Sequence, residues 1–275
     1  MVKNIAEEKL GVFIWFGYRI PIVERVRLIR EAGFETVLHW WDDSFIDVEG
    51  ISKEEQARII RNAGLIIENA HLQCDHINDL WMDSLDGQTV FNRYLSDMDS
   101  LAKAEIPVAV MHITSGMNPP PVSAIGMQRM QALVERAQKV NVRIAIENTR
   151  NTHILMNVLD AIRSPALGFC YDSGHDYVWS KTPCEVLVRY KERLLAVHLH
   201  DNRGVTDDHL PVGDGVVDWS AVLAEISKSA YNGSLTLESD SAEIPLSRTP
   251  SEHLRMHFEA AKSCFSANAS AKKHP

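Results

Sequence analysis

The chain has 275 residues, of which 45% are hydrophobic and 24% charged, values typical of a soluble globular protein. Asp and Glu number 37 against 28 Lys and Arg, and the resulting net charge of −9 argues against a nucleic-acid partner, whose phosphates need a basic surface. No apolar run approaches the roughly 18 residues of a membrane-spanning helix, so we expect no membrane association. Histidine is unusually frequent, with 12 residues, and many of these follow apolar runs.

The N-terminal residues lack the apolar core of a secretion signal. The cysteines are widely spaced and form no CxxC pair, as expected for reduced thiols. They are Cys74, Cys170, Cys184 and Cys264. Both observations predict a cytoplasmic protein.

Short apolar runs alternate with segments of helical periodicity along the chain. The predicted strands are residues 11–16, 36–41, 65–71, 108–113, 143–147, 167–172, 194–200 and 234–238. The predicted helices are residues 21–32, 52–62, 92–104, 123–139, 152–163, 184–193, 219–227 and 251–263. Several strands are nearly continuous apolar runs, which is typical of strands buried on both faces of a parallel sheet. The helix after the second strand begins with a capping box formed by Ser52 and Glu55.

Strict alternation of eight strand–helix units predicts an α/β protein, specifically a single-domain (β/α)8 TIM barrel over residues 1–265. The rival fold is an open doubly wound sheet. Such a sheet more often has a Gly-rich phosphate loop after its first strand, and Gly11 and Gly17 do not form one. Residues 266–275 are small, polar and aperiodic, and we expect them to form a flexible C-terminal tail.

Six of the eight predicted strands end at or beside a histidine or an acid. These residues are His71, His112, Glu147, Asp172, His198 and Glu238. Any one of them can cap a helix or satisfy a loop, but barrel active sites lie where the strands end, so the six should converge. Three imidazoles and three carboxylates at one place would repel or stay unsatisfied without a cation. We therefore expect a divalent metal ion, with Mn, Zn, Mg and Co all compatible with these ligands.

Further polar residues adjoin this set. His175 lies three residues after Asp172, and His200 follows His198 by two, which places both on the same side of a strand. The loop after the seventh strand contains Asp207, Asp208 and His209. These loop residues are either additional site residues or a solvated acidic surface.

The ordered segments around these positions resemble the xylose-isomerase-like TIM-barrel superfamily. They are Glu147, residues 172–175 (DSGH), residues 198–201 (HLHD), residues 208–215 (DHLPVGDG) and Glu238. The superfamily includes sugar phosphate isomerases and epimerases, inosose dehydratases and the endonuclease IV type of apurinic endonuclease. The resemblance spans nearly the whole chain, and it is more specific for the fold and the metal site than for the substrate.

In the epimerase branch, the resemblance implies one metal ion. Its ligands would be Glu147, Asp172, His198 and Glu238. It also implies that His175 and His200 contact the substrate. Ketose 3-epimerases place a substrate-binding arginine six residues after the metal-binding histidine. Here that position is Gly204, and Arg203 is one residue too early, so the sequence does not support a specific 3-epimerase assignment.

In the endonuclease IV branch, the resemblance implies three zinc ions and nine ligands. The matching residues are His71, His112, Glu147, Asp172, His175, His198, Asp207, His209 and Glu238. Similar residues recur in superfamily members without an apparent DNA role, so this set alone does not mean DNA repair.

The resemblance thus favours a metal-dependent sugar or polyol isomerase or epimerase of carbohydrate metabolism. Glu147 and Glu238 would exchange a proton with the substrate through an enediolate that the metal stabilises. The alternatives are dehydration or elimination on a keto-polyol, zinc-dependent phosphodiester hydrolysis, and a non-catalytic barrel with a relict metal site. Four tryptophans either line the sugar pocket or pack in the core. They are Trp15, Trp40, Trp41 and Trp81. Related barrels often form dimers or tetramers, so a homo-oligomer is also expected.

Overall fold

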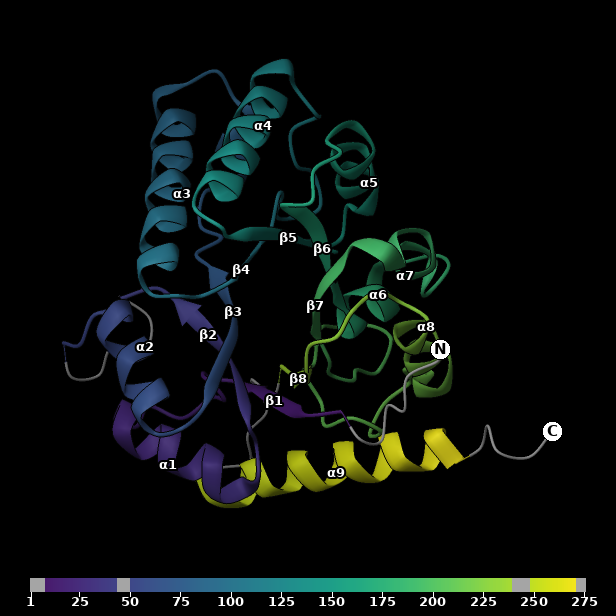
Figure 1. Cartoon of the computed structure of the whole chain (residues 1–275). Coiled ribbons are helices and arrows are strands. Elements are labelled where there is room, and N and C mark those ends of the chain that lie inside the picture. Colours follow the sequence, from purple (N-terminus) through teal and green to yellow (C-terminus); the bar gives the residue numbers. More distant parts are fainter. Residues whose placement is uncertain (1–7, 44–49, 239–247, 271–275) are drawn as a thin grey trace.

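The computed structural model describes residues 8–43, 50–238 and 248–270 of the chain. Eight parallel strands form one sheet in the order β7-β6-β5-β4-β3-β2-β1-β8. The strands are β1 (Leu10–Phe13), β2 (Thr36–Trp41), β3 (Ile66–Leu72), β4 (Val108–Met111), β5 (Arg143–Glu147), β6 (Leu167–Asp172), β7 (Leu194–His198) and β8 (Leu235–Leu237). The helices lie outside this ring of strands (Figure 1).

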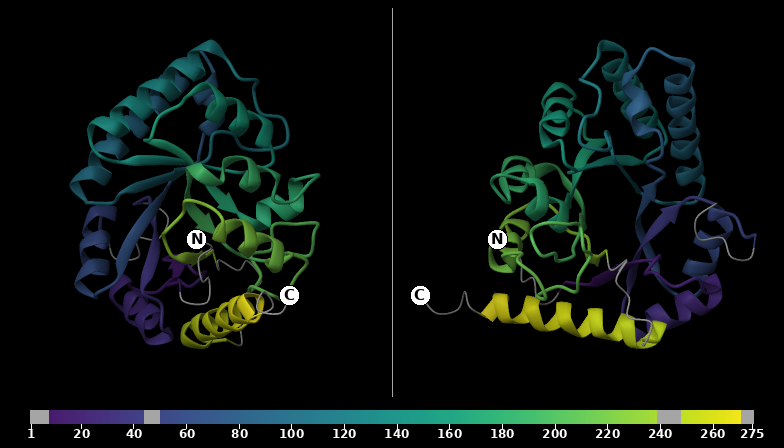
Figure 2. Two further views of the ribbon diagram at one scale, coloured as in Figure 1. Left: turned by 45° about the vertical axis from the view of Figure 1, so that its right-hand side comes forward. Right: turned by 180° about the vertical axis from the view of Figure 1, so that it is seen from behind.

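The described helices follow the strands in chain order. They are α1 (Ile22–Ala32), α2 (Lys53–Asn62), α3 (Leu85–Lys103), α4 (Ala124–Lys139), α5 (Thr152–Ala161), α6 (Ser173–Trp179), α7 (Glu185–Tyr190), α8 (Trp219–Ser227) and α9 (Pro250–Ser270), with short 3-10 helices η2 (Ile77–Trp81) and η3 (Lys191–Arg193). Figure 2 shows α3 and α4 side by side and α9 extending along α1. This arrangement confirms the predicted (β/α)8 TIM barrel. None of the helices in the described ranges is long and apolar enough to cross a membrane.

The ring closes between β7 and β8 through a single residue, Leu199. Its N–H donates to the carbonyl of Thr236 at 2.9 Å, and its own carbonyl accepts from the N–H of Glu238 at 3.1 Å. Leu199 and Leu237 form an isolated parallel bridge. The closure therefore lies directly beside two of the predicted metal ligands, His198 and Glu238.

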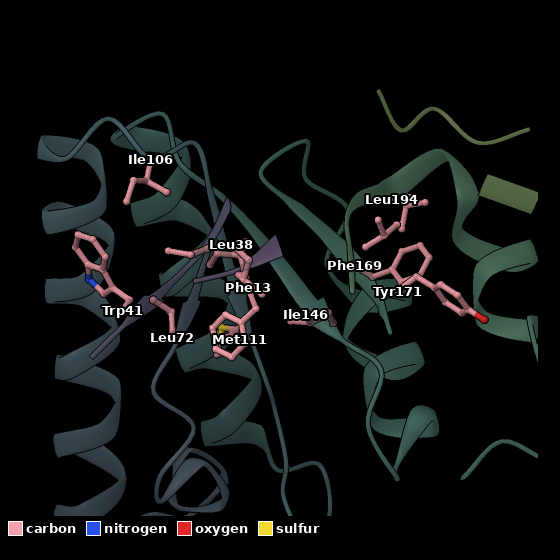
Figure 3. Close-up of a cluster of buried hydrophobic side chains, with 14 of the residues drawn as sticks. Phe13, Leu38, Trp41, Leu72, Ile106, Met111, Ile146, Phe169, Tyr171 and Leu194 are labelled. Carbon is pink, nitrogen blue, oxygen red and sulfur yellow. The ribbon is translucent and has the colours of Figure 1, made fainter. Parts of the chain in front are cut away.

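Alternation along each strand separates two layers of buried side chains. Across β4 to β7, the inner layer is made of small residues that fit the narrow barrel interior. They are Val108, Val110, Ala145, Cys170 and Ala196. Their neighbours Ile146 and Phe169 belong to the larger cluster that packs under the helices, where burying each such side chain contributes about 1.5–3 kcal/mol. Figure 3 shows part of this outer cluster, including Trp41 and Tyr171. Because alternate residues face inward, Glu147 follows Ala145 into the barrel.

Several element boundaries differ from the sequence prediction. Helix α3 begins at Leu85 rather than at residue 92, because the Ser84 hydroxyl accepts a hydrogen bond from the N–H of Gly87 at 3.0 Å and caps the helix. Helix α6 was not predicted. Helix α9 continues to Ser270, so the segment expected to be a tail from Ser266 onward begins inside a helix, and residues 271–275 lie outside the described ranges.

Candidate metal centre

Glu147, at the end of β5, is the central residue of the strand-end cluster. Its Oε1 lies 3.2 Å from Nδ1 of His198. Its Oε2 lies 3.1 Å from Nε2 of His71 and 3.2 Å from Nε2 of His112. The side chain is only 1% exposed. One buried carboxylate thus contacts three histidines from three other strands or strand ends.

The four ligands expected for a single metal ion come together as one group. They are Glu147, Asp172, His198 and Glu238. One ligand atom from each lies within 4.8 Å of the others, which is compatible with binding around one ion, and all four residues are buried. They come from β5, β6, β7 and the residue after β8, so parallel strands deliver them to the same end of the barrel.

A second group shares Glu147 and adds His71 from β3 and His112 from the end of β4. Its ligand atoms also lie within 4.8 Å of one another. The His71 and His112 rings meet edge to face, with centroids 5.0 Å apart. Glu147 is therefore placed where it could bridge two ions.

The remaining candidate ligands meet at Asp207. Nε2 of His175 and Nε2 of His209 approach the same oxygen of Asp207, Oδ2, at 3.1 and 3.5 Å. His209 also forms a ligand-spaced group with His200 and Glu238. All nine positions that matched the three-zinc pattern are consequently gathered at one end of the barrel.

Carboxylates raise the pKa of two buried histidines of the cluster, His175 and His198. Burial alone lowers the pKa of His198, but Glu147 and Glu238 overcome this effect and raise it to about 9. Burial likewise opposes protonation of His175, and the Asp172 and Asp207 carboxylates raise its pKa to about 9. Burial raises the pKa of Glu147, but His198 and the other histidines bring it well below its usual range. The raised pKa values of His175 and His198 favour protonated imidazoles, whose charge offsets that of the neighbouring carboxylates.

The donor set fits a divalent cation. The nine candidate ligands supply imidazole nitrogens and carboxylate oxygens, a combination that suits zinc and manganese, and the buried Cys170 thiol also lies within 4.8 Å of ligand atoms of Glu147 and His198. Two buried imidazole nitrogens of the cluster, Nε2 of His198 and Nδ1 of His200, have no hydrogen-bond partner among the residues that the structure describes. A bound cation would neutralise the carboxylates in place of the protons.

Sequence reasoning missed two residues that fix Asp172 and His200. The Asn148 side chain bonds both backbone groups of Asp172 at 2.8 Å, through Nδ2 to the carbonyl and through Oδ1 from the N–H. The Ser173 hydroxyl donates to the carbonyl of His200 at 2.8 Å and accepts from its N–H at 3.0 Å. Each directly follows a predicted strand end, which was the available signal.

Asp201 is a third supporting residue, seen in the sequence only as part of a motif. Its buried carboxylate accepts four hydrogen bonds. The donors are Asn202 N–H, Gly213 N–H, Val217 N–H and the Trp219 indole N–H, at 2.9, 3.1, 3.0 and 2.9 Å. These contacts fold the loop between β7 and α8, which contains Asp207 and His209, back onto the barrel.

The residues predicted to contact substrate lie at different depths. Trp40 is half-buried and stacks on His71 with centroids 5.3 Å apart, whereas Trp15 is largely buried, with the Arg25 guanidinium 5.6 Å from its ring. His200 is buried, contacts both Asp172 oxygens at 3.1 Å and stacks on His209. Its contact with substrate stays a prediction.

Arg203 is exposed and pairs with Asp208 at 3.5 Å. Two of the tryptophans offered as pocket walls are buried in the outer layer instead. Trp41 lies under Lys53 of α2, and Trp81 packs against Gly126 of α4 and donates to the carbonyl of Ile113 at 2.6 Å.

Comparison with known proteins agrees with this architecture. An uncharacterized protein of Sinorhizobium fredii, y4fM, is 36% identical over 128 residues, which are 44% of this chain and 41% of that protein. An inosose dehydratase of Lacticaseibacillus casei is 24% identical over 155 residues, 47% of this chain and 49% of that protein. The matched region thus spans less than half the length of either curated relative.

A solved D-tagatose 3-epimerase-like protein superposes with a TM-score of 0.75 and 18% identity, over 96% of this chain and 99% of that one. At this identity the similarity shows a shared fold. The family described as xylose isomerase-like TIM barrel matches residues 26–260. With this match over most of its length, the chain belongs to the xylose isomerase-like TIM barrel family.

Proposed function

We propose that the protein is a divalent-metal-dependent enzyme that isomerises or epimerises a sugar, a sugar phosphate or a related polyol. The observation that supports this most directly is the buried group of Glu147, Asp172, His198 and Glu238 at the mouth of the barrel. A cation bound there would polarise a substrate carbonyl and increase the acidity of the adjacent C–H.

Glu147 and Glu238 are the proposed proton-transfer residues. They stand on β5 and directly after β8, with β6 and β7 between them across the closure of the ring, so they can approach a bound sugar from different sides. His198 lies between them, with Nδ1 at 3.2 Å from Glu147 Oε1 and 3.6 Å from Glu238 Oε2. One carboxylate would remove the proton next to the carbonyl, and the other would return a proton to the resulting enediolate.

Dehydration of a keto-polyol is the neighbouring reaction. It begins with the same removal of a proton next to a carbonyl, and one relative is named an inosose dehydratase. The site supports either outcome, depending on whether the substrate has a leaving hydroxyl beside the carbanion. A cytoplasmic location and a homo-oligomeric state stay predictions from the sequence.

Solvent-isotope exchange tests the proposed proton transfer. Glu147→Gln and Glu238→Gln should each abolish conversion of ketoses or inososes, and each should abolish deuterium exchange from D2O on the side of the substrate that the replaced residue serves, because an amide cannot accept the proton. Metal content is measured on every preparation, so loss of exchange in protein that retains metal identifies a role in proton transfer. The exposed Glu185 provides a charge-matched control, Glu185→Gln. Full exchange in both site variants would contradict the proposal.

A second candidate function, zinc-dependent phosphodiester hydrolysis, is favoured by the assembly of all nine matching residues at one place. In that case His71, His112, His175, Asp207 and His209 would hold additional ions. Metal analysis separates the two functions: about three zinc ions per chain supports hydrolysis, and one supports sugar chemistry. Cleavage of duplex DNA with a single abasic site would decide directly in favour of the second function.

A further inference from the structure

The exposed side chain of Arg150 lies at the edge of the candidate metal centre. The proposed proton-transfer mechanism does not involve this residue. The Arg150 guanidinium carbon lies 4.1 Å from the centroid of the Trp179 ring. The Trp179 ring, in turn, lies with its centroid 4.6 Å from that of His175. The Trp179 ring therefore lies between Arg150 and His175 of the buried cluster.

The backbone on both sides of Arg150 is anchored. Two residues before it, Asn148 bonds both backbone groups of Asp172 at 2.8 Å. One residue after it, Asn151 donates from Nδ2 to the carbonyl of Gly116 at 3.1 Å. With the ring of Trp179 beneath the guanidinium, these contacts hold the cation in place before any ligand arrives, which reduces the entropy lost on binding.

Arg150 forms no ion pair with a carboxylate among residues 8–43, 50–238 and 248–270, whereas Arg203 pairs with Asp208 and Arg189 pairs with Asp160. Stacking on an aromatic face leaves the planar edge of a guanidinium, with its N–H donors, directed away from the ring. That edge matches the paired oxygens of a phosphate or carboxylate.

We propose that Arg150, supported by Trp179, binds an anionic group at the end of the substrate remote from the reacting carbons. The substrate class would then be an acidic sugar, either a phosphate ester or a sugar acid. This inference rests on the proposed sugar chemistry and narrows it. His175, next to Trp179, would mark the boundary between the reacting part and the charged end.

Three ligands with one carbon framework test the charge preference. D-fructose, D-fructose 6-phosphate and D-fructuronate have a hydroxymethyl, a phosphate and a carboxylate at the same end. Isothermal titration calorimetry of metal-loaded protein should show tighter binding of the charged ligands, by about 10- to 100-fold, as for a hydrogen bond to a charged group. The charged ligand that binds more tightly shows whether the site takes a phosphate ester or a sugar acid. Equal binding of all three ligands contradicts the proposal.

Substitutions of Arg150 test whether this residue causes the preference for charged ligands. Arg150→Gln should remove it while leaving D-fructose binding unchanged, and Arg150→Lys should restore part of it, because lysine keeps the charge but not the planar donor edge. Arg163→Gln is the matched control, since Arg163 is exposed just beyond the other end of α5. An equal loss in Arg163→Gln would show a general effect of net charge and overturn the assignment.

A direct spectroscopic measurement separates this inference from the proposed function. The Nε–Hε signal of Arg150, assigned by its absence in Arg150→Gln, should shift on titration with inorganic phosphate or D-fructuronate. An unchanged signal with both anions and with the sugar phosphate overturns the inference, even if isotope exchange is observed. A shifted signal without isotope exchange supports the anion site and contradicts only the proposed reaction.

Discussion

Glu147 is the central residue of the candidate metal centre. Its carboxylate belongs to three ligand-spaced groups at once and contacts His71, His112 and His198. The strand end where it lies was identified from the sequence because apolar residues precede it and barrels collect such ends at one face. That one residue belongs to several groups of candidate ligands could not be predicted, because this depends on distances between side chains from different strands.

Close packing at Gly174 holds His200 against Asp172. A Cβ atom at this position would lie 1.9 Å from Cε1 of His200. We therefore expect Gly174→Ala to displace the imidazole and lower the free energy of unfolding by about 1–3 kcal/mol, the usual effect of overpacking a buried site. Urea denaturation provides the measurement.

A double-mutant cycle identifies the cause. If the clash with His200 is responsible, Gly174→Ala should cost little in a His200→Ala background. An equal cost in both backgrounds would mean that the added methyl group disturbs the α6 backbone itself.

The loop between β7 and α8 shows how one carboxylate can organise a functional element. Asp201 accepts hydrogen bonds from three backbone N–H groups and one indole, and the loop presents Asp207 and His209 to the site. Asp201→Asn should lower the free energy of unfolding by about 2–4 kcal/mol, because an amide cannot accept four such bonds without turning its NH2 toward donors.

The matched control for this loop is Asp218→Asn. Asp218 caps α8 by accepting from the N–H of Ala221 at 3.0 Å, and asparagine caps helices equally well, so little change is expected. Thermal denaturation of both variants gives the comparison. Similar stabilities for the two variants would contradict the organising role of Asp201.

At the level of elements, the alternation of apolar runs with segments of helical periodicity was sufficient to predict all eight strands. Parallel strands that are buried on both faces consist of nearly continuous apolar residues. Helix α6 was missed because it is short and begins inside the site, where Asp172 Oδ1 caps it by accepting from the N–H of His175 at 2.6 Å. The polar residues there look like a turn. For Trp41 and Trp81, the sequence left pocket and core packing open, because periodicity does not distinguish the inside of a barrel from its helix-facing side.

The stability of the whole molecule should depend on a histidine of β2 that is not one of the candidate ligands. His39 is buried between β2 and α2, with Nε2 3.0 Å from the carbonyl of Lys53. Burial, aided by the positive charge of Arg25, lowers its pKa to about 4. In the unfolded chain the pKa of this histidine is near 6.5, so the unfolded state binds the proton more readily than the folded state does. The contribution of His39 to the free energy of unfolding is therefore full above about pH 6.5 and falls as the pH decreases toward 4.

This predicts a loss of about 2 kcal/mol between about pH 8 and about pH 5 from His39 alone. His39→Gln, which keeps a donor but cannot titrate, should flatten that part of the pH profile in urea denaturation, whereas the exposed His153→Gln should leave it unchanged. Identical profiles for wild type and His39→Gln would contradict the prediction.

The closure of the barrel at Leu199 has a consequence for synthesis of the chain. Glu238 directly follows β8, the last strand to leave the ribosome, and its N–H makes one of the two hydrogen bonds that join β8 to Leu199. A growing chain therefore lacks the fourth ligand until its final strand has been made and has docked. Binding of a metal ion by the complete group of four would then require that β8 has joined the ring.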